Sequence, residues 1–242
     1  MAVTLRPITP ADVPDAGRIC HDAFAAIAGG HNFPPDFPDR DVATEVISRL
    51  VGHAGFYGVV AEEGGRVLGS NFVDERSPIV GLGPITVDPA AQNKGVGAAL
   101  MRHMIERADR NRAPGLRLLQ SGYHTRSLCL YTKLGFAPRE PIANLQGRPL
   151  GITVPGCTVR PARVGDAESC DRLCRAVHGH DRGGELRDAI ADGVASLVER
   201  DGRITGYTTS IAFFGHAVGE SDDDLKALIG AAPAFGGPGF LL

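Results

Sequence analysis

The pattern of hydrophobic and polar positions over residues 3–140 switches between the periods of strands and helices. Apolar runs bounded by turn residues predict strands at 3–7, 57–62, 66–73, 81–87 and 116–120. Helical spacing predicts helices at about 10–28, 40–52, 95–111 and 126–134. The second of these helices is expected to bury a face formed by Val42, Val46 and Leu50. The first part of the chain is therefore predicted to mix strands and helices.

Local signals indicate where these helices begin and end. Thr9, Pro10 and Asp12 are typical of a helix start, because they supply a cap, a preset φ and a negative charge. Residues 29–38 include three prolines and cannot continue that helix, since proline removes a backbone donor. Gly135 is expected to end the helix at 126–134.

Part of the first half recurs after residue 157. At one constant offset, the chain repeats Leu5-Arg6-Pro7, Asp12, Arg18 and Cys20 as Val159-Arg160-Pro161, Asp166, Arg172 and Cys174. Residues 65–69 then recur as 202–206 in the same order, which predicts a duplication. We expect a first domain at 1–146, a linker at 147–157 and a shorter, degenerate repeat at 158–242. Because residues 239–242 look like the start of a strand, truncation and completion by another chain both remain open.

Composition argues against several classes of function. The chain has 25 Lys and Arg against 28 Asp and Glu, and no basic cluster indicates nucleic acid or an anionic membrane. No run approaches the roughly 18 apolar residues of a membrane span, and residues 1–7 lack the apolar core of a signal peptide. Five cysteines without a CxxC pair indicate free thiols and a reducing, cytoplasmic setting.

One strand–loop–helix unit carries the strongest chemical signal. It contains Gln92-Asn93-Lys94-Gly95-Val96-Gly97-Ala98 at the predicted start of a helix. A helix N-terminus offers unpaired N–H groups and partial positive charge, and glycines let the backbone approach phosphate oxygens. This loop therefore suits a diphosphate. A dinucleotide fingerprint is the alternative, but Leu100 stands where its third Gly or Ala would be, and the loop is too long.

Two motifs, in this order, resemble those of the GNAT superfamily of N-acetyltransferases. Gln92-x-x-Gly95-x-Gly97 is similar to its (Gln/Arg)-x-x-Gly-x-(Gly/Ala) signature, and residues 85–89 look like its fourth strand. Downstream, residues 130–136 are similar to its second signature, a Leu-Tyr-x-Lys-Leu-Gly-Phe turn. The resemblance covers about residues 3–140. It implies an α/β fold with a mixed, mostly antiparallel central sheet flanked by helices, acetyl-CoA as co-substrate and no metal.

The resemblance also assigns roles to residues. It places the acid that protonates the leaving thiolate at Tyr131, since a tyrosine O–H is protonated at neutral pH. A tyrosine that only packs on the sheet is the alternative. His124 stands where many relatives have an Asn that binds the cofactor arm. Three roles remain open for His124: a hydrogen-bond donor to the cofactor, a general base, or a surface histidine without a role in the site. The implied acetyl-CoA contacts are Ile85, Thr86, Val87, Gln92, Asn93, Lys94, Gly95, Val96, Gly97, Ala98 and Ser127.

The general base is not identified by the resemblance. Relatives often carry a Glu on the fourth strand, but residues 81–84 hold no acid. Asp74, Glu75, His124 and ordered water all remain open as bases. In the family, the fourth and fifth strands splay apart, so that fourth-strand N–H groups polarise the thioester carbonyl. The acceptor is expected beside residues 31–38, for which an ordinary solvent loop is the alternative.

The second half lacks the phosphate motif. Residues 219–226 carry three successive Asp at a predicted helix start capped by Ser221, and this charge would repel a pyrophosphate. We expect this half to support folding, access or pairing instead of binding CoA. Cys170, Cys174 and His178 fall at helical spacing, yet buried core cysteines are the expected interpretation, and no metal site is predicted. Residues 178–182 are expected to form an exposed connector, with a cleft lining as the alternative.

The sequence thus predicts an acetyl-CoA-dependent N-acetyltransferase that moves an acetyl group from the thioester to a primary amine. The alternative is a CoA-binding sensor or a structural module without turnover. The predicted partner is a small-molecule or peptide amine, with no nucleic acid and no membrane, and a homodimer is left open. The motifs do not name the acceptor.

Overall fold

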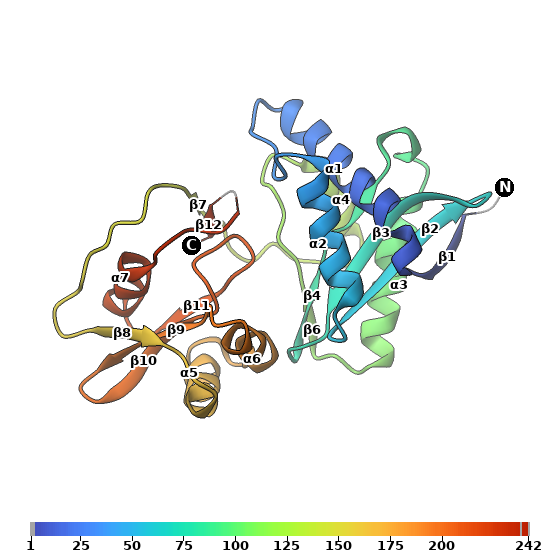
Figure 1. Ribbon diagram of the computed structural model, residues 1–242. Coiled ribbons are helices and arrows are strands. Elements are labelled where there is room, and N and C mark those ends of the chain that lie inside the picture. The colour runs from blue at the N-terminus through green and yellow to red at the C-terminus, as the bar shows by residue number, and fades with distance from the viewer. Residues whose placement is uncertain (1–2, 238, 242) are drawn as a thin grey trace. The chain divides into compact units, whose positions relative to one another are not determined.

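The chain folds into two compact units, residues 1–139 and 140–242 (Figure 1). The computed structural model describes residues 3–237 and 239–241. Residues 140–146 belong to the second unit, where β7 (Asn144–Leu145) pairs with β12 (Phe240–Leu241). The division therefore falls a few residues before the linker expected at 147–157.

The first unit is a six-stranded sheet flanked by helices. In chain order it contains β1 (Thr4–Pro7), η1 (Pro10–Asp12), α1 (Val13–Gly29), α2 (Arg40–Gly52), β2 (Phe56–Glu63), β3 (Arg66–Asp74), β4 (Ile79–Leu82), β5 (Thr86–Val87), η2 (Pro89–Ala91), α3 (Val96–Arg110), β6 (Gly115–Arg117) and α4 (Thr125–Lys133). The strand order is β1-β2-β3-β4-β6, and β5 also pairs with β3. Only β4 and β6 run parallel among these pairs. The predicted fold class, a mixed and mostly antiparallel sheet between helices, is confirmed.

The predicted strand at 81–87 is two strands separated by a bulge. Val73 pairs with Leu82, and Ser70 pairs with Thr86. Between these pairs β3 contributes two residues, whereas the other strand contributes residues 83–85, so one residue is extra. Pro84 has no N–H to donate to a ladder, which favours the interruption at this point. The single-strand prediction was wrong because the hydrophobic pattern of a strand does not reveal one extra residue relative to its partner strand.

The two faces of this sheet are covered by different helices. One face packs on α1 and α2 through a cluster of Ala16, Cys20, Phe37, Ala43, Ile47 and Phe72. The other face packs on α3 and α4 through Leu100, Met101, Met104 and Tyr131, together with strand residues that include Val59 and Val73. Phe72 and Val73 thus point to opposite faces, as neighbours on a strand do.

The buried face of α2 differs from the predicted one. Ala43 and Ile47 are fully buried, whereas Val42 is 38% exposed, and Val46 and Leu50 are only partly buried. The reason is the close approach of α1, because a Cβ at Gly17 would overlap Thr44. This contact turns the Ala43 side of α2 inward, so the predicted face was wrong by about one position.

The second unit contains a four-stranded antiparallel sheet of order β11-β10-β9-β8. Its elements are β8 (Thr158–Pro161), η3 (Val164–Asp166), α5 (Ala167–His178), α6 (Gly183–Ala191), β9 (Ser196–Arg200), β10 (Arg203–Thr208), β11 (Ala217–Gly219) and α7 (Asp222–Ala231). The helix α6 was not among the predicted elements. The segment expected to be an exposed connector, residues 178–182, joins α5 to α6.

Each unit is tied together by the same arrangement of one Arg and two acids. In the first unit, Arg6 donates to both oxygens of Asp12 at 2.8 Å and to Glu62 at 2.7 Å. In the second unit, Arg160 donates to Asp166 at 2.8 and 3.0 Å and to Glu199 at 2.9 Å. Each arginine thereby links its own strand, β1 or β8, to the turn before a helix and to the paired strand, β2 or β9. The duplication itself remains a prediction.

Asp12 is the acid whose loss is expected to show most clearly in the stability of the first unit. Hydrogen bonds from Arg6 outweigh burial and, with those from Thr9, hold the pKa of Asp12 well below its usual range. A depressed folded-state pKa stabilises the fold above the unfolded pKa, and this contribution is lost as pH falls. Because Arg6 is about one third exposed, we expect Asp12→Asn to lower the free energy of unfolding by only about 1–2 kcal/mol at pH 7.

Urea denaturation at pH 7 and below about pH 4 measures this effect. The difference between the wild type and Asp12→Asn should shrink at the lower pH. Asp15→Asn is the matched control, since Asp15 is 62% exposed, and it should change stability by less than about 0.5 kcal/mol. A difference that stays constant with pH would contradict the ion-pair explanation.

Candidate functional site

The first turn of α3 is left open at its N-terminal end. Gly95 is the cap residue, has a φ of +85°, and no side chain caps the helix. The first helical hydrogen bond runs from the Ala99 N–H to the Gly95 carbonyl at 3.0 Å, so the amides of Val96, Gly97 and Ala98 precede it. A Cβ at Gly95 or Gly97 would meet nothing closer than 3.6 Å. No side chain of these two residues therefore blocks the backbone N–H groups at the place where an anion would bind.

The loop before α3 is held in place by side-chain bonds. The Gln92 amide donates to the Val87 carbonyl at 3.1 Å, and Arg126 on α4 donates to the Gln92 side-chain oxygen at 2.6 Å. Lys94 donates to the Ala90 carbonyl at 3.1 Å, and Asn93 is exposed with a φ of +64°. Gln92 thus connects the strand to α4. No local pattern in the sequence indicates the role of Arg126, because the contact spans 34 positions.

The strands that flank the bulge diverge beside this loop. The pairing of β4 with β6 ends at Gly81 and Arg117, and no ladder joins β5 to β6 among the described residues. The predicted strand at 116–120 is accordingly shorter, at Gly115–Arg117. The Asp88 N–H bonds to Leu68 on β3, and backbone groups alternate along a strand, so the Val87 N–H points to the open side. Thr86 is buried against Ser70, and Ile85 lies in the bulge.

Three predicted residues lie along one helix beside the loop. Tyr131 is 9% exposed, and burial raises the pKa of its hydroxyl, partly offset by a hydrogen bond with Ser127. His124 caps α4: its Nδ1 accepts the Ser127 N–H at 3.3 Å, and its Nε2 lies 3.1 Å from the Ser127 hydroxyl. Burial and Arg126 lower the pKa of His124, which keeps the ring neutral at pH 7. Both ring nitrogens of His124 are thus engaged by Ser127.

Two of the acids considered as bases are held in ion pairs. Asp74 accepts bonds from Arg76 at 2.6 and 2.9 Å. Glu75 accepts bonds from Arg107 on α3 at 2.7 and 2.8 Å and from Asn111 at 3.0 Å. The oxygens of both carboxylates already accept guanidinium hydrogen bonds, so they are not free to receive the proton of an acceptor amine. The base therefore has to be sought elsewhere.

An aromatic stack joins the loop between α1 and α2 to the loop before α4. The Tyr123 ring stacks on Phe33 with centroids 4.5 Å apart and on His31 at 5.1 Å. Phe33 is nevertheless 52% exposed, so one edge of the stack faces solvent. Tyr123 directly precedes His124, which places the stack at the start of α4. The sequence suggested residues 31–38 as an acceptor wall but did not indicate Tyr123.

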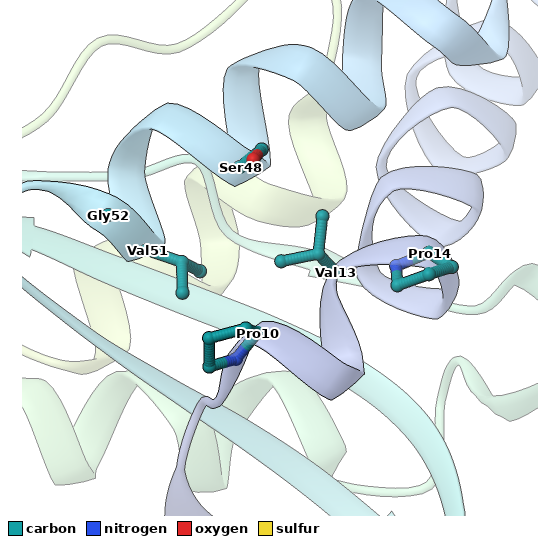
Figure 2. Close-up of a pocket in the computed structure, with 6 residues that line it drawn as sticks. All are labelled: Pro10, Val13, Pro14, Ser48, Val51 and Gly52. Carbon is teal, nitrogen blue, oxygen red and sulfur yellow. The ribbon is translucent and has the colours of Figure 1, made fainter.

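A shallow apolar hollow lies elsewhere on the first unit (Figure 2). It has a volume of about 300 Å³ and is lined by Pro10, Val13, Pro14, Ser48, Val51 and Gly52. These residues come from the start of α1 and the end of α2. The loop at 30–39 joins the opposite ends of the same two helices, about 20 Å away for a 13-residue helix. The lining holds no charged side chain, so the hollow offers little for acyl-transfer chemistry.

The corresponding helix start in the second unit is closed. Ser221 caps α7, and its hydroxyl and N–H both donate to Asp224, at 2.7 and 2.9 Å. Asp224 is fully buried and also accepts from Thr205 at 2.6 Å and from Arg200 at 3.2 Å. The acid run at this helix start therefore satisfies the chain's own donors, in contrast to the uncapped start of α3.

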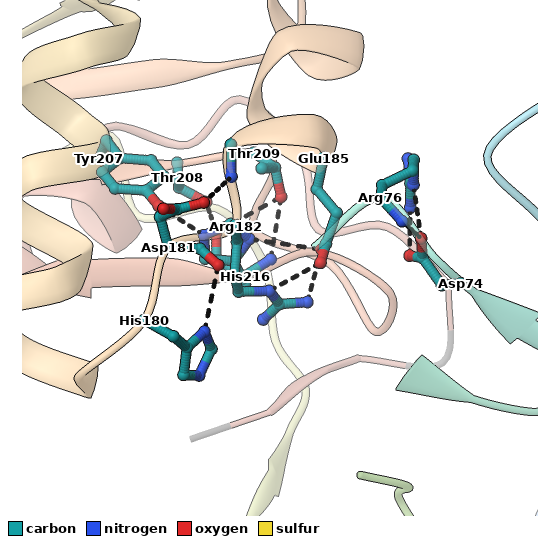
Figure 3. A network of polar contacts seen from close by, with 11 residues as sticks. Asp74, Arg76, His180, Asp181, Arg182, Glu185, Tyr207, Thr208, Thr209 and His216 are labelled. Atoms are coloured by element: carbon teal, nitrogen blue, oxygen red, sulfur yellow. Dashed lines mark hydrogen bonds and ion pairs between the residues drawn. The ribbon is translucent and has the colours of Figure 1, made fainter. Parts of the chain in front are cut away.

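The second unit also contains a buried polar network (Figure 3). His216 lies 2.9 Å from the Tyr207 hydroxyl and 3.6 Å from the Glu185 carboxylate, to which Arg182 donates at 2.8 Å. Burial would raise the pKa of Glu185, but hydrogen bonds from His216 and Arg182 outweigh it and hold the pKa well below its usual range. The network joins α6 to β10 and to the residue before β11, and such satisfied networks fix one arrangement of a core.

The cysteines of α5 lie in the core of the second unit. Cys170 and Cys174 are fully buried in an apolar cluster, whereas His178 is exposed. Within the described part of the chain, no three His, Cys, Asp or Glu side chains come together in a way that could hold a metal ion. None of the helices in residues 3–237 and 239–241 combines the length and apolar character needed to cross a bilayer.

Comparison with known families identifies the class of the first unit. Residues 53–138 match the family model described as acetyltransferase (GNAT) domain. The family model thus confirms, for residues 53–138, the resemblance to GNAT acetyltransferases that the two motifs predicted. This match includes both motifs, and it lies within the first unit.

Two curated relatives are named as acetyltransferases, and a solved structure shares the fold. The mycothiol acetyltransferases of Mycobacterium sp. strain MCS and strain JLS are 29% and 28% identical to this chain over 132 residues. The match covers 52% of this chain and 43% of each relative, so it spans less than half the length of the curated relatives. The structure of a mutant of the BH1408 protein from Bacillus halodurans is 13% identical, with a TM-score of 0.52, over 59% of this chain and 98% of that one. At that identity the likeness is one of fold alone.

Gly97→Glu is the substitution that tests the open helix start. A Cβ at Gly97 meets Leu130 and Val87 only at ordinary contact distances, and an acid in the first turn suits the helix dipole. The fold should therefore survive. The added carboxylate would occupy and repel the diphosphate site, so acetyl-CoA affinity should fall by about 100-fold or more.

Calorimetric titration with acetyl-CoA measures the loss, and the melting temperature checks the fold. Arg102→Glu, at an exposed position of the same helix, is the control for added negative charge and should keep the affinity within a few-fold. Unchanged binding by Gly97→Glu would show that the diphosphate does not lie at this turn.

Proposed function

We propose that this protein is an acetyl-CoA-dependent N-acetyltransferase whose active centre lies in the first unit. The observation that carries the proposal is the uncapped start of α3 beside the divergence of β5 from β6. Acetyl-CoA could place its diphosphate on the helix start and its extended arm along the open edge of β5, because the two features lie side by side. The GNAT match over residues 53–138 supports the same assignment.

Binding of acetyl-CoA is assigned to the backbone more than to side chains. The amides of Val96, Gly97 and Ala98 supply donors to the diphosphate, with Lys94 adding charge at the rim. Gln92 and Arg126 hold the loop, since their mutual bond of 2.6 Å links β5 to α4. The residues Ile85 to Val87 present the strand edge, and Asn93 and Ser127 complete the predicted contacts.

The chemistry is assigned to one strand amide and one tyrosine. The bound co-substrate supplies an activated acetyl thioester. The Val87 N–H, which points to the open edge, donates to the thioester carbonyl and stabilises the charge that develops there. Tyr131 is kept protonated by its buried position and donates its proton toward the leaving sulfur. The acceptor is a primary amine; the names of the two mycobacterial relatives make a small-molecule amine the first class to try.

The second unit is assigned no part in binding acetyl-CoA. Its corresponding helix start is capped by Ser221, and Asp224 there is already bonded to its neighbours. Calorimetric titration with acetyl-CoA should accordingly give one site per chain. Two sites would refute the assignment of the second unit, and no binding would refute the proposed function.

Tyr131→Phe tests the assignment of the acid. Removing one hydroxyl from a tyrosine that is mostly buried should leave the fold intact and acetyl-CoA affinity within about threefold. The turnover number should fall by roughly 100-fold, the typical contribution of a positioned proton donor. Thiol release during turnover with primary amines measures the rate.

Tyr57→Phe is the matched control for the loss of a tyrosine hydroxyl. Its hydroxyl lies 3.0 Å from His103 on α3, and this variant should keep the wild-type rate within about twofold. If Tyr131→Phe also keeps the wild-type rate, Tyr131 is a packing residue and the acid is another group.

A further inference from the structure

Asp36, in the loop between α1 and α2, is a half-buried carboxylate, one oxygen of which has an unmet hydrogen-bonding requirement. Its Oδ2 is shielded from solvent and has no hydrogen-bond partner among residues 3–237 and 239–241. Burial raises the pKa of this carboxyl, and its own backbone amide opposes the shift only in part. The titratable group that faces it is the Cys20 thiol of α1, whose pKa burial and the Asp36 charge raise to about 12. A buried acceptor without a donor is costly, so it calls for a functional explanation.

The anchors on either side of Asp36 hold it between β3 and the start of α4. Phe37 is buried in the same cluster as Phe72 of β3, and the Phe72 carbonyl accepts the Gly83 N–H at 2.9 Å, at the start of the bulge. Phe33, on the other side, stacks on Tyr123, which directly precedes the cap of α4.

Asp36 lies on the face of the sheet that α1 and α2 cover, because its neighbour Phe37 and the Cys20 thiol that it faces both belong to the core on that side. Pro34 and Pro35 restrict the backbone of the segment before it. This face is opposite α3, which packs on the other side of the sheet. This is the side from which a nucleophile would reach a thioester that approaches along α3 and α4.

We propose that Asp36 is the general base that accepts the proton of the acceptor amine; this inference rests on the proposed acetyltransferase function. The amine nitrogen forms a bond to the acetyl carbon while the carbon–sulfur bond breaks. The amine proton passes to the Asp36 carboxylate, and the sulfur takes the Tyr131 proton. Solvent then removes the proton from Asp36 and restores that of Tyr131, so no further reactant is needed. An acidic side chain of the loop thus serves where the fourth strand has none.

Other carboxylates of the first unit are less suited to this role. Asp74 and Glu75 are paired with Arg76 and Arg107. Asp22, close to the same loop, is bonded to Arg40 at 3.0 Å, and interactions with His21 and Arg40 lower its pKa despite burial. A raised pKa brings Asp36 nearer to neutral pH, where a general base is most effective.

The test compares Asp36→Asn with the wild type. The amide keeps the size and the hydrogen bond but cannot accept a proton. With spermidine, glucosamine and kanamycin as acceptors, the turnover number should fall by about 100-fold or more, while acetyl-CoA affinity stays within about twofold. The acid limb of the wild-type pH–rate profile should be absent from the variant. Asp41→Asn, at an exposed position in the first turn of α2, is the control and should behave as the wild type.

Thermal stability supplies a readout that needs no acceptor. A carboxyl whose pKa is raised in the folded state destabilises the fold increasingly as pH rises. Asp36→Asn should therefore melt at the same temperature as the wild type or higher at pH 7, and the difference should vanish below about pH 4. A variant that melts lower at pH 7 would show that Asp36 is a structural residue and would overturn the proposal.

The outcomes separate this inference from the proposed function. If the wild type acetylates an amine and Asp36→Asn does so at a similar rate, the base is another group and the proposed function stands. If the wild type binds acetyl-CoA but acetylates none of the three amines, the proposed function fails for this class of acceptor, and the inference fails with it.

Discussion

The proposed chemistry of the first unit depends on one irregularity, the three residues that separate β4 from β5. One extra residue and the missing N–H of Pro84 break the ladder with β3 between Leu82 and Thr86. As a result β4 stays paired with β6, whereas β5 does not, and the Val87 N–H is left without a neighbouring strand. The open start of α3, the Tyr131 side of α4 and the loop at 30–39 all lie around this divergence. A continuous strand would close the edge on which each of these roles depends.

The helix starts of α3 and α7 differ in their caps. In both units, the residue after the last strand bonds back to the hairpin: the Asp88 N–H to Leu68 at 2.8 Å, and the Glu220 N–H to Thr205 at 2.9 Å. The helix that follows is uncapped at Gly95 but fully capped by Ser221 and Asp224. A side-chain cap contributes about 1 kcal/mol, so an uncapped start gives up stability that a bound anion could restore. The second unit keeps that stability and loses the anion site.

The carboxylates of the first unit also divide into groups that stabilise the fold and one that is left unsatisfied. The carboxylates of Asp12, Asp22, Asp74 and Glu75 each accept hydrogen bonds from a guanidinium, which stabilises the fold and occupies their oxygens. One oxygen of Asp36 is buried without a hydrogen-bond partner among the described residues, at a cost in stability. Groups that are strained or unsatisfied in the free protein are characteristic of functional sites, because activity and stability make opposing demands there.

The sequence by itself determined the elements, the class of fold and the position of the phosphate loop. Prolines at 34, 35 and 38, the cap residues and the glycines at 95 and 97 act on their own backbone, so their effects can be read locally. The tertiary structure alone decided the split of strand four, the turn of α2 toward Ala43, the bond from Arg126 to Gln92 and the pairing of Glu75 with Arg107. It also decided that one buried oxygen of Asp36 has no hydrogen-bond partner among residues 3–237 and 239–241. These features depend on which side chains meet across dozens of positions and on how deeply each is buried, and neither quantity is encoded in a local pattern.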